Sequence, residues 1–206
     1  MHYTAEEGFA PLPFDPFKAI VAPRPVGWIS TLDTQGRPNL APYSFFNAVS
    51  SRPNMIGFSS EGMKDSPRNA RDTGEFVFSL ATLPLLEAMN RTSEEVAPGV
   101  DEFALAGLEP APSRVVRPPR VAASPAALEC RVLSCTELVD LEGRATDRWW
   151  VLGQVVATYV DEAFLRDGRF DTAAAQPLGR CGYRDYAAVT DIFELLRPTD
   201  PEGAIR

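Results

Sequence analysis

Histidine is almost absent from this sequence, since the single one, His2, follows the first methionine. Hydrolases built on Ser–His–Asp or Cys–His pairs need an imidazole held next to the nucleophile. Histidine-based zinc hydrolases need imidazole ligands around the metal. With this single histidine, hydrolases of the first kind are not expected, and a histidine-based zinc hydrolase is excluded.

Cysteine is also scarce. Cys130, Cys135 and Cys181 make an odd number, and no two of them form a CxxC pair. A disulfide framework and a structural zinc site are therefore not expected. Cys130 and Cys135 lie in an apolar stretch, where we expect them to be small buried side chains.

Long apolar runs and targeting signals are missing as well. No stretch approaches the roughly 18 apolar residues that indicate a membrane-spanning helix. The first residues, MHYTAEEGFAPLPF, lack the basic start and apolar centre of a secretory signal. No GxGxxG follows a strand-like segment, so a Rossmann nucleotide site is not supported. The sequence predicts a cytoplasmic protein with no membrane partner.

Acidic residues outnumber basic ones, and the formal net charge is −8. An acidic surface repels the phosphates of DNA and RNA, so we expect no nucleic-acid partner. Any anion site in this chain must depend on positive charge gathered at one place.

Strand-like segments, by contrast, are frequent. Apolar or alternating runs of this kind predict strands, and they are Val26–Leu32, Asn39–Val49, Met55–Ser60, Glu75–Ala81, Leu128–Leu141, Arg148–Asp161 and Val189–Leu196. Helical signals are few and short. The pattern therefore favours a mainly β protein with short helices, built as an antiparallel barrel rather than from alternating βαβ units.

The length of 206 residues suits one domain over residues 1–206. Residues 1–19 read as an extended lead-in held to the domain by Phe9, Phe14 and Phe17, and residues 198–206 as a loose tail. The proline-rich stretch 105–127 could be a linker between domains. We expect a surface excursion within one domain instead, because too few strands precede it to close a barrel.

One predicted helix begins at Ser66. Serine followed by proline is typical of an N-cap and a first helical position, and Gly74 is typical of a C-terminal stop. The helix start offers N–H groups, and the neighbouring Lys64 offers charge, to a phosphate. The alternative is an ordinary capped helix with a solvated lysine. A second helix is predicted over 82–91, with an apolar stripe of Leu83, Leu86 and Met89.

Three motifs give the chain a recognisable likeness. RPVGWIST, APYSFFNAVSSRP and KDSPRN, in this order and spacing, resemble the flavin reductase-like family, in the branch that contains flavoredoxins. The likeness extends over residues 14–197. It implies an FMN-binding split β-barrel that is usually a homodimer.

The resemblance also implies a site. It places the FMN phosphate at the KDSPRN motif, and the flavin beside the segment Ser44–Asn47, where polar and aromatic residues can serve the edge and face of the ring. The alternative for that segment is a barrel strand with a polar outer face. The expected cofactor-binding residues are Arg24, Ser30, Thr31, Ser44, Phe45, Phe46, Asn47, Ser59, Ser60, Lys64, Asp65, Ser66, Asn69, Arg180 and Tyr183.

For some of these residues the sequence leaves an alternative open. Arg24, between two prolines, fits a specific contact with the ligand or a structural ion pair. Arg180, Tyr183 and Tyr186 belong to PLGRCGYRDYAAV, which matches a late family motif. This segment approaches the flavin of the same or the second subunit, or forms a surface loop. Many relatives carry a histidine where this chain has Tyr159, and a tyrosine does not titrate near pH 7.

The function implied is an FMN-binding oxidoreductase that passes hydride or electrons from NAD(P)H through FMN to free flavin or another acceptor. No catalytic side chain is expected, because the cofactor carries the chemistry. One alternative is a flavoredoxin-type electron carrier with a protein partner as electron donor or acceptor. Another is a flavin-binding protein without redox turnover.

Overall fold

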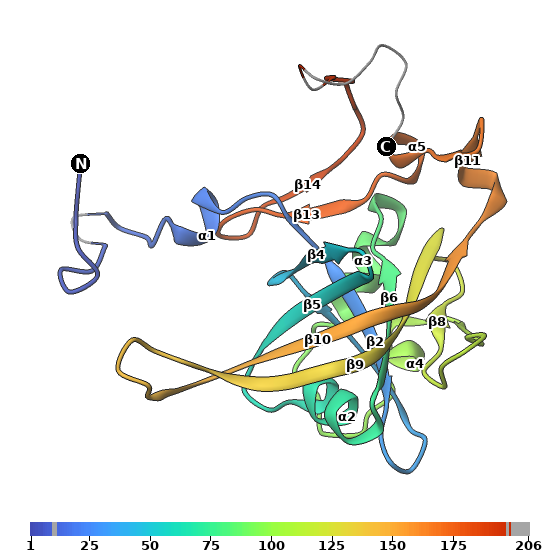
Figure 1. Cartoon of the computed structure of the whole chain (residues 1–206), viewed down its shortest axis with the longest axis horizontal. Coiled ribbons are helices and arrows are strands. Elements are labelled where there is room, and N and C mark those ends of the chain that lie inside the picture. Colours follow the sequence, from blue (N-terminus) through green and yellow to red (C-terminus); the bar gives the residue numbers. More distant parts are fainter. Residues whose placement is uncertain (10–11, 197, 199–206) are drawn as a thin grey trace.

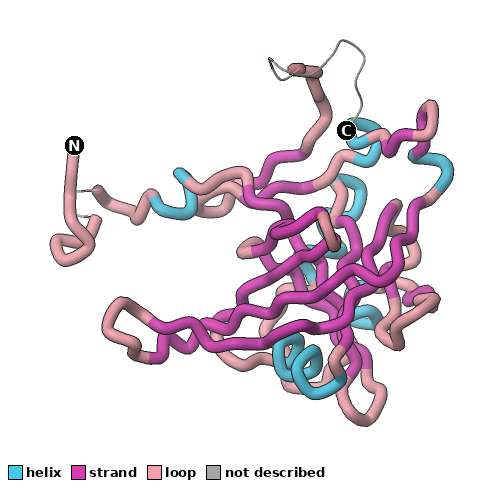
Figure 2. The backbone as a smooth tube through the Cα atoms, in the orientation of Figure 1, coloured by secondary structure: helices cyan, strands magenta, loops and turns pink. Residues whose placement is uncertain are grey.

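The computed structural model describes residues 1–9, 12–196 and 198. Its centre is a seven-stranded antiparallel sheet in the order β3-β2-β6-β9-β10-β5-β4. The bounds of these strands are β2 Gly27–Leu32, β3 Pro38–Tyr43, β4 Phe46–Ser51, β5 Asn54–Glu61, β6 Glu75–Leu80, β9 Ala126–Val139 and β10 Ala145–Val160. Short helices surround the sheet (Figures 1 and 2). The fold is therefore mainly β with short helices, as the sequence predicts.

The two edges of this sheet are joined by only two residues. β3 ends at Tyr43 on one edge and β4 begins at Phe46 on the other. A link as short as Ser44–Phe45 brings the edges together, so the sheet has to curl round on itself. The result is a barrel left open along one seam. The predicted single strand over Asn39–Val49 is wrong in this respect, because the chain changes edge in its middle.

Aromatic side chains fill the barrel and bridge the seam. Phe46 stacks on Phe78 with ring centroids 4.8 Å apart. A Cβ on Gly27 would lie 2.5 Å from the ring of Phe46, so only glycine fits this crossing. Trp28 is fully buried in the core, and its Nε1 donates to Oγ1 of Thr92 at 2.9 Å.

Helix α2, Asp65–Thr73, packs against β2, β9 and β10 at the lower end of the barrel in Figure 1. Gly74 ends it in the left-handed conformation, as predicted. The start differs from the prediction, since Lys64 is the N-cap and Ser66 is the second helical residue. The hydroxyl of Ser66 accepts from Asn39 instead of capping the helix.

Shorter elements complete the fold. They are α1 Phe17–Ile20, a 3₁₀ turn Leu83–Leu85 leading into α3 Leu86–Arg91, α4 Glu102–Ala106, β7 Pro110–Ala111, β8 Arg120–Val121, a 3₁₀ turn Glu162–Phe164, β11 Leu165–Arg166, β12 Arg169–Phe170 and α5 Thr172–Ala175. A small three-stranded sheet, β1-β13-β14, stands beside the barrel. Its strands are β1 Arg24–Pro25, β13 Leu178–Arg180 and β14 Tyr186–Ala188.

Hydrogen bonds to side chains of the barrel strands hold the proline-rich stretch in place. Glu129 on β9 is buried, and its carboxylate accepts from the amides of Arg114, Val115 and Val116 at 2.6–3.1 Å. The amide of Val121 donates to Oγ of Ser79 on β6. Both contacts join the stretch to strands of the barrel.

Several local predictions are wrong. Val189–Leu196 contains no strand. Leu83 is exposed, and Met89 is the buried residue of its helix. Phe9, Phe14 and Phe17 are exposed rather than buried against the domain, and the lead-in runs outward (Figure 1). The predicted tail lies outside the described residues except for its first residue.

Exposed apolar side chains gather on segments that leave the barrel. The β9–β10 hairpin projects beyond the sheet and carries exposed Leu138, Val139 and Leu141. The segment after β14 exposes Ile192, Phe193 and Leu195. Within the described residues, no helix is long and apolar enough to cross a membrane.

Candidate functional site

The start of α2 carries a lysine that makes no ion pair within the described residues. No side chain caps the helix N-terminus, and Lys64 is exposed at that position. In the part of the chain that the structure describes, Lys64 forms no ion pair, whereas Asp65 is paired with Arg68 on the same helix. The Asp65 carboxylate also accepts from the amide of Gly99 at 3.3 Å. The neighbouring acid is therefore largely neutralised, and the helix N-terminus with Lys64 can attract an anion.

Ser66 and Asn69 take a different part from the one predicted. Ser66 is 1% exposed and its Oγ accepts from Nδ2 of Asn39 at 2.8 Å. Asn69 is also buried, and its Nδ2 donates to Oγ1 of Thr31 at 3.2 Å. The two side chains fix α2 to β3 and β2. They set the position of the helix start and do not reach its outer surface.

The seam of the barrel exposes the segment between β3 and β4. Phe45 points outward and is 42% exposed, whereas Phe46 points into the core. The carbonyl of Phe45 accepts from the amide of Ser59 at 2.8 Å, which ties the segment to β5. Asn47 is exposed and Ser44 is half-buried. An aromatic face among small polar groups is therefore presented to solvent here.

Two cations stand over the ring of Phe45. Lys18 Nζ on α1 is 5.9 Å from the ring centroid, and the guanidinium carbon of Arg24 is 5.8 Å from it. Arg24 donates to the carbonyls of Lys18, Val21 and Cys181, so it joins the lead-in to the segment after β13. Its Nε is the only buried side-chain nitrogen or oxygen without a partner among the described residues.

Ser30, Thr31 and Ser60 are buried inside the barrel and do not join this surface. Ser30 donates to the carbonyl of Pro119, and Ser60 donates to the carbonyl of Gly62 at 3.0 Å. Thr31 accepts from Asn69, as described above. Small polar side chains on adjacent strands looked alike in the sequence, but these three satisfy backbone or side-chain groups of the protein itself.

Arg180 and Tyr183 lie on the β13–β14 hairpin. A guanidinium nitrogen of Arg180 donates to the carbonyl of Tyr183 at 2.9 Å, and the guanidinium stacks 4.3 Å from the ring centroid of Tyr186. The Tyr183 ring turns away and meets the edge of Phe14, with centroids 5.9 Å apart. The structure thus brings Arg180 toward Ser44 but leaves Tyr183 with the lead-in.

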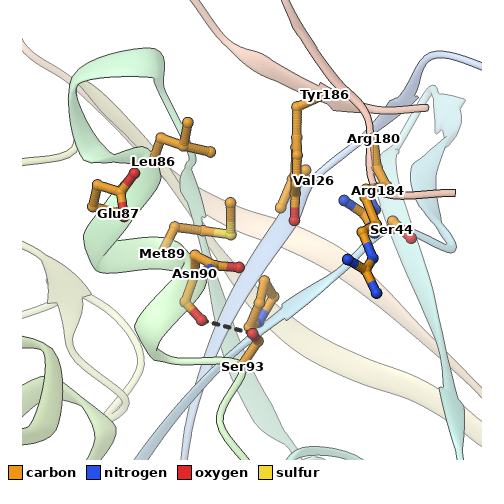
Figure 3. Close-up of a pocket in the computed structure, with 11 residues that line it drawn as sticks. Val26, Ser44, Leu86, Glu87, Met89, Asn90, Ser93, Arg180, Arg184 and Tyr186 are labelled. Atoms are coloured by element: carbon orange, nitrogen blue, oxygen red, sulfur yellow. Dashed lines mark hydrogen bonds between the residues drawn. The ribbon is translucent and has the colours of Figure 1, made fainter. Parts of the chain in front are cut away.

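A cavity of about 550 Å³ opens between α3 and this hairpin (Figure 3). Its lining residues are Val26, Pro42, Ser44, Leu86, Glu87, Met89, Asn90, Ser93, Arg180, Arg184 and Tyr186. Only Ser44 and Arg180 belong to the predicted site. Tyr186 belongs to the same late motif and was considered with Arg180 and Tyr183. Arg184 was missed as a site residue, although it directly follows Tyr183 and its charge was the available signal.

Two acidic side chains, Glu102 and Tyr43, are shielded from solvent beside and on β3. Burial raises the pKa of Glu102, although its carboxylate accepts from the amide of Leu40 at 2.9 Å, which opposes that rise. Burial likewise raises the pKa of the Tyr43 hydroxyl, against hydrogen bonds from Ser66 and Ser60. Both groups therefore hold their protons more tightly in the folded protein than they would in water.

The ring of Tyr159 stacks against a neighbouring arginine. The guanidinium carbon of Arg120 lies 3.6 Å from the centroid of the Tyr159 ring. This stack joins β10 to β8 on the side of the barrel and gives Tyr159 a structural contact.

The sequence profile described as "Flavin reductase like domain" matches residues 21–174. The chain belongs to the flavin reductase-like family. A Deinococcus radiodurans protein of uncharacterised function is 38% identical over 194 residues, covering 88% of this chain and 82% of that protein.

Solved structures agree with this assignment. Nitrilotriacetate monooxygenase component B from Bacillus cereus matches with a TM-score of 0.87 at 29% identity, covering 95% of this chain and 98% of that one. The 2-nitrobenzoate 2-nitroreductase NbaA from Pseudomonas fluorescens matches at 0.83 and 26%, covering 99% and 100%.

Two more distant structures establish the fold. The flavoredoxin of Desulfovibrio vulgaris has a TM-score of 0.74 at 23% identity, covering 99% of this chain and 100% of that one. A putative flavin reductase with a split-barrel domain from Shewanella frigidimarina has a TM-score of 0.80 at 22%, covering 96% and 99%. Together with the open seam, they identify the antiparallel split β-barrel.

Proposed function

We propose that this protein binds FMN and uses it to pass electrons from NAD(P)H to free flavin or another acceptor. The observation that carries the proposal is the outward-facing Phe45 at the barrel seam, with Lys18 and Arg24 over its ring, in a chain of the flavin reductase-like family. When bound, FMN supplies hydride acceptance at N5 and release of electrons to a second substrate.

The residues present fit a flavin nucleotide. FMN carries a dianionic phosphate and a ring that gains negative charge on reduction, and the chain places positive charge at two matching points. Lys64 with the α2 start suits the phosphate, and Lys18 with Arg24 suits the ring. Ser59, opposite Phe45, precedes Lys64 by five residues, which extended chain spans in at most roughly 17 Å. One extended FMN molecule can bridge this distance.

The remaining side chains orient these two points. Ser66 and Asn69 hold α2 against β3 and β2, so the barrel fixes the position of the proposed phosphate site at the start of α2. The Ser59 amide holds the Phe45 carbonyl. No side chain near the seam needs to act as an acid or base, which agrees with the single histidine lying at the chain end.

We also propose a homodimer. Leu138, Val139 and Leu141 on the β9–β10 hairpin, and Ile192, Phe193 and Leu195 after β14, are exposed in the single chain. Exposed apolar patches on projecting segments are typical of subunit interfaces. A second copy is the occupant favoured by the family, in which homodimers are usual.

Steady-state oxidation of NADH and NADPH by the purified protein, with and without free FMN, tests the enzymatic proposal. We expect oxidation that depends on the protein and increases with added FMN. Activity with a ferredoxin-like donor, but not with NAD(P)H, would instead indicate an electron carrier. That alternative is favoured by the flavoredoxin fold. Binding of FMN without turnover from either donor would indicate a non-catalytic flavin protein.

A further inference from the structure

The cavity between α3 and the β13–β14 hairpin carries two arginines without a counter-ion. Arg180 and Arg184 line the same wall, and in the described ranges neither pairs with a carboxylate. Glu87 is the only acid in the lining, and Figure 3 shows it beyond Tyr186, on the opposite wall. In a chain of net charge −8, two guanidinium groups in one concave wall make a local region of positive potential.

Arg180 is held in a defined orientation. Its guanidinium stacks on Tyr186, the residue directly opposite it in the β13–β14 pairing, and one of its N–H groups donates to the carbonyl of Tyr183. A guanidinium has five N–H donors, so most of its hydrogen-bonding capacity is left for a ligand. Arg184 makes no hydrogen bond or ion pair within the part of the chain described, and its guanidinium lies beside that of Arg180 in Figure 3.

The rest of the lining suits a flat apolar ring. Val26 and Met89 are buried, and they line the cavity together with the apolar residues Pro42 and Leu86. The ring of Tyr186 stands between the arginine wall and the α3 wall (Figure 3). A volume of about 550 Å³ lies within the range of small-molecule sites.

We propose that this cavity binds the second reactant of the flavin site, a planar aromatic compound whose acid group is held by Arg180 and Arg184. The inference rests on the proposed function, because Ser44 lines the cavity and also belongs to the segment that faces the flavin. A ring bound against Val26 and Met89 therefore lies next to the barrel seam. A nicotinamide nucleotide supplies the acid as phosphate, and an aromatic acid supplies it as carboxylate.

Calorimetric titration with four probes tests this assignment. Benzoate and nicotinamide mononucleotide carry the acid group, and benzamide and nicotinamide riboside lack it. We expect the acid probes alone to bind, more weakly as sodium chloride is raised. The tighter of the two identifies the source of the acid. Charge-assisted hydrogen bonds of this kind make us expect Arg184→Ala to weaken binding about tenfold or more, and Arg184→Lys less.

Arg169→Ala is the matched control, since Arg169 is an exposed arginine on β12 outside the cavity. It should leave probe binding unchanged, and Arg184→Ala should leave FMN affinity unchanged. The assignment is overturned if wild-type protein binds neither acid probe, if the two variants behave alike, or if FMN displaces benzoate competitively. If acid probes bind through Arg184 but FMN does not bind at all, the cavity assignment stands and the flavin function fails.

Discussion

The side-chain amide of Asn39 donates a 2.8 Å hydrogen bond to Oγ of Ser66, and both residues are buried between β3 and α2. A second buried contact, from Asn69 to Thr31, joins the same helix to β2. The helix that carries Lys64 at its start is thus fixed to two neighbouring strands. Its orientation is set by polar contacts within the protein, made by Ser66 and Asn69, whose sequence motif predicts contact with a ligand.

Replacing Ser66 by alanine should destabilise the protein. The change leaves Nδ2 of Asn39 buried without an acceptor, which costs about 1–3 kcal/mol of unfolding free energy. Urea unfolding measures it. The Asn39→Ala/Ser66→Ala double variant is the control, and it should lose less stability than the two single losses added together. Equal stability of Ser66→Ala and wild type would show that this contact does not hold the helix.

Replacing Lys64 by alanine should weaken FMN binding about ten- to a hundredfold, because a charge-assisted phosphate contact contributes roughly 1.5–3 kcal/mol. Quenching of FMN fluorescence on titration gives the dissociation constant. Arg71→Ala removes an equal charge from the other end of α2 and should have little effect. An unchanged dissociation constant for Lys64→Ala would remove this residue from the site.

Glu102 should make stability fall as the pH rises. Its folded-state pKa is raised above the usual value of 4.5 by burial, so the folded protein binds the proton more tightly than the unfolded chain. The destabilisation begins near pH 4.5 and grows until the pH passes the folded-state pKa. Glu102→Gln keeps an oxygen for the amide of Leu40 and removes the charge. Unfolding in urea at a series of pH values should show a smaller fall for this variant. A difference from wild type that stays constant with pH contradicts the argument.

Sedimentation should give about twice the 22.5 kDa mass of one chain at micromolar concentration. The reason is the exposed apolar surface on the β9–β10 hairpin and after β14, which a second copy can cover. A single species with the mass of one chain would rule the homodimer out.

The sequence was informative where a pattern is local. The alternation of Phe76, Phe78 and Leu80 predicted β6, and Gly74 predicted the end of α2. Prediction from the sequence failed where a contact between distant residues determines the role of a side chain. Ser66 accepts from Asn39, which is 27 residues away, and is therefore not a cap. The change of sheet edge at Ser44 follows from the closure of the barrel, which no local pattern encodes.

The candidate site was predicted in the same uneven way. Phe45 and Lys64 are exposed, and their contact with FMN stays a prediction, whereas Ser30, Thr31 and Ser60 are buried and satisfy groups inside the barrel. Lys18 was missed because the lead-in was expected to be held by its phenylalanines. Its contact with Phe45 arises from the way Arg24 folds the chain back.

The visible spectrum of the protein, after incubation with FMN and removal of free ligand, tests the central claim most directly. We expect the absorption bands of oxidised flavin in the protein fraction, and we expect them to bleach on anaerobic addition of NADH or NADPH. A protein fraction without flavin absorption, in a sample shown to be folded, would contradict it.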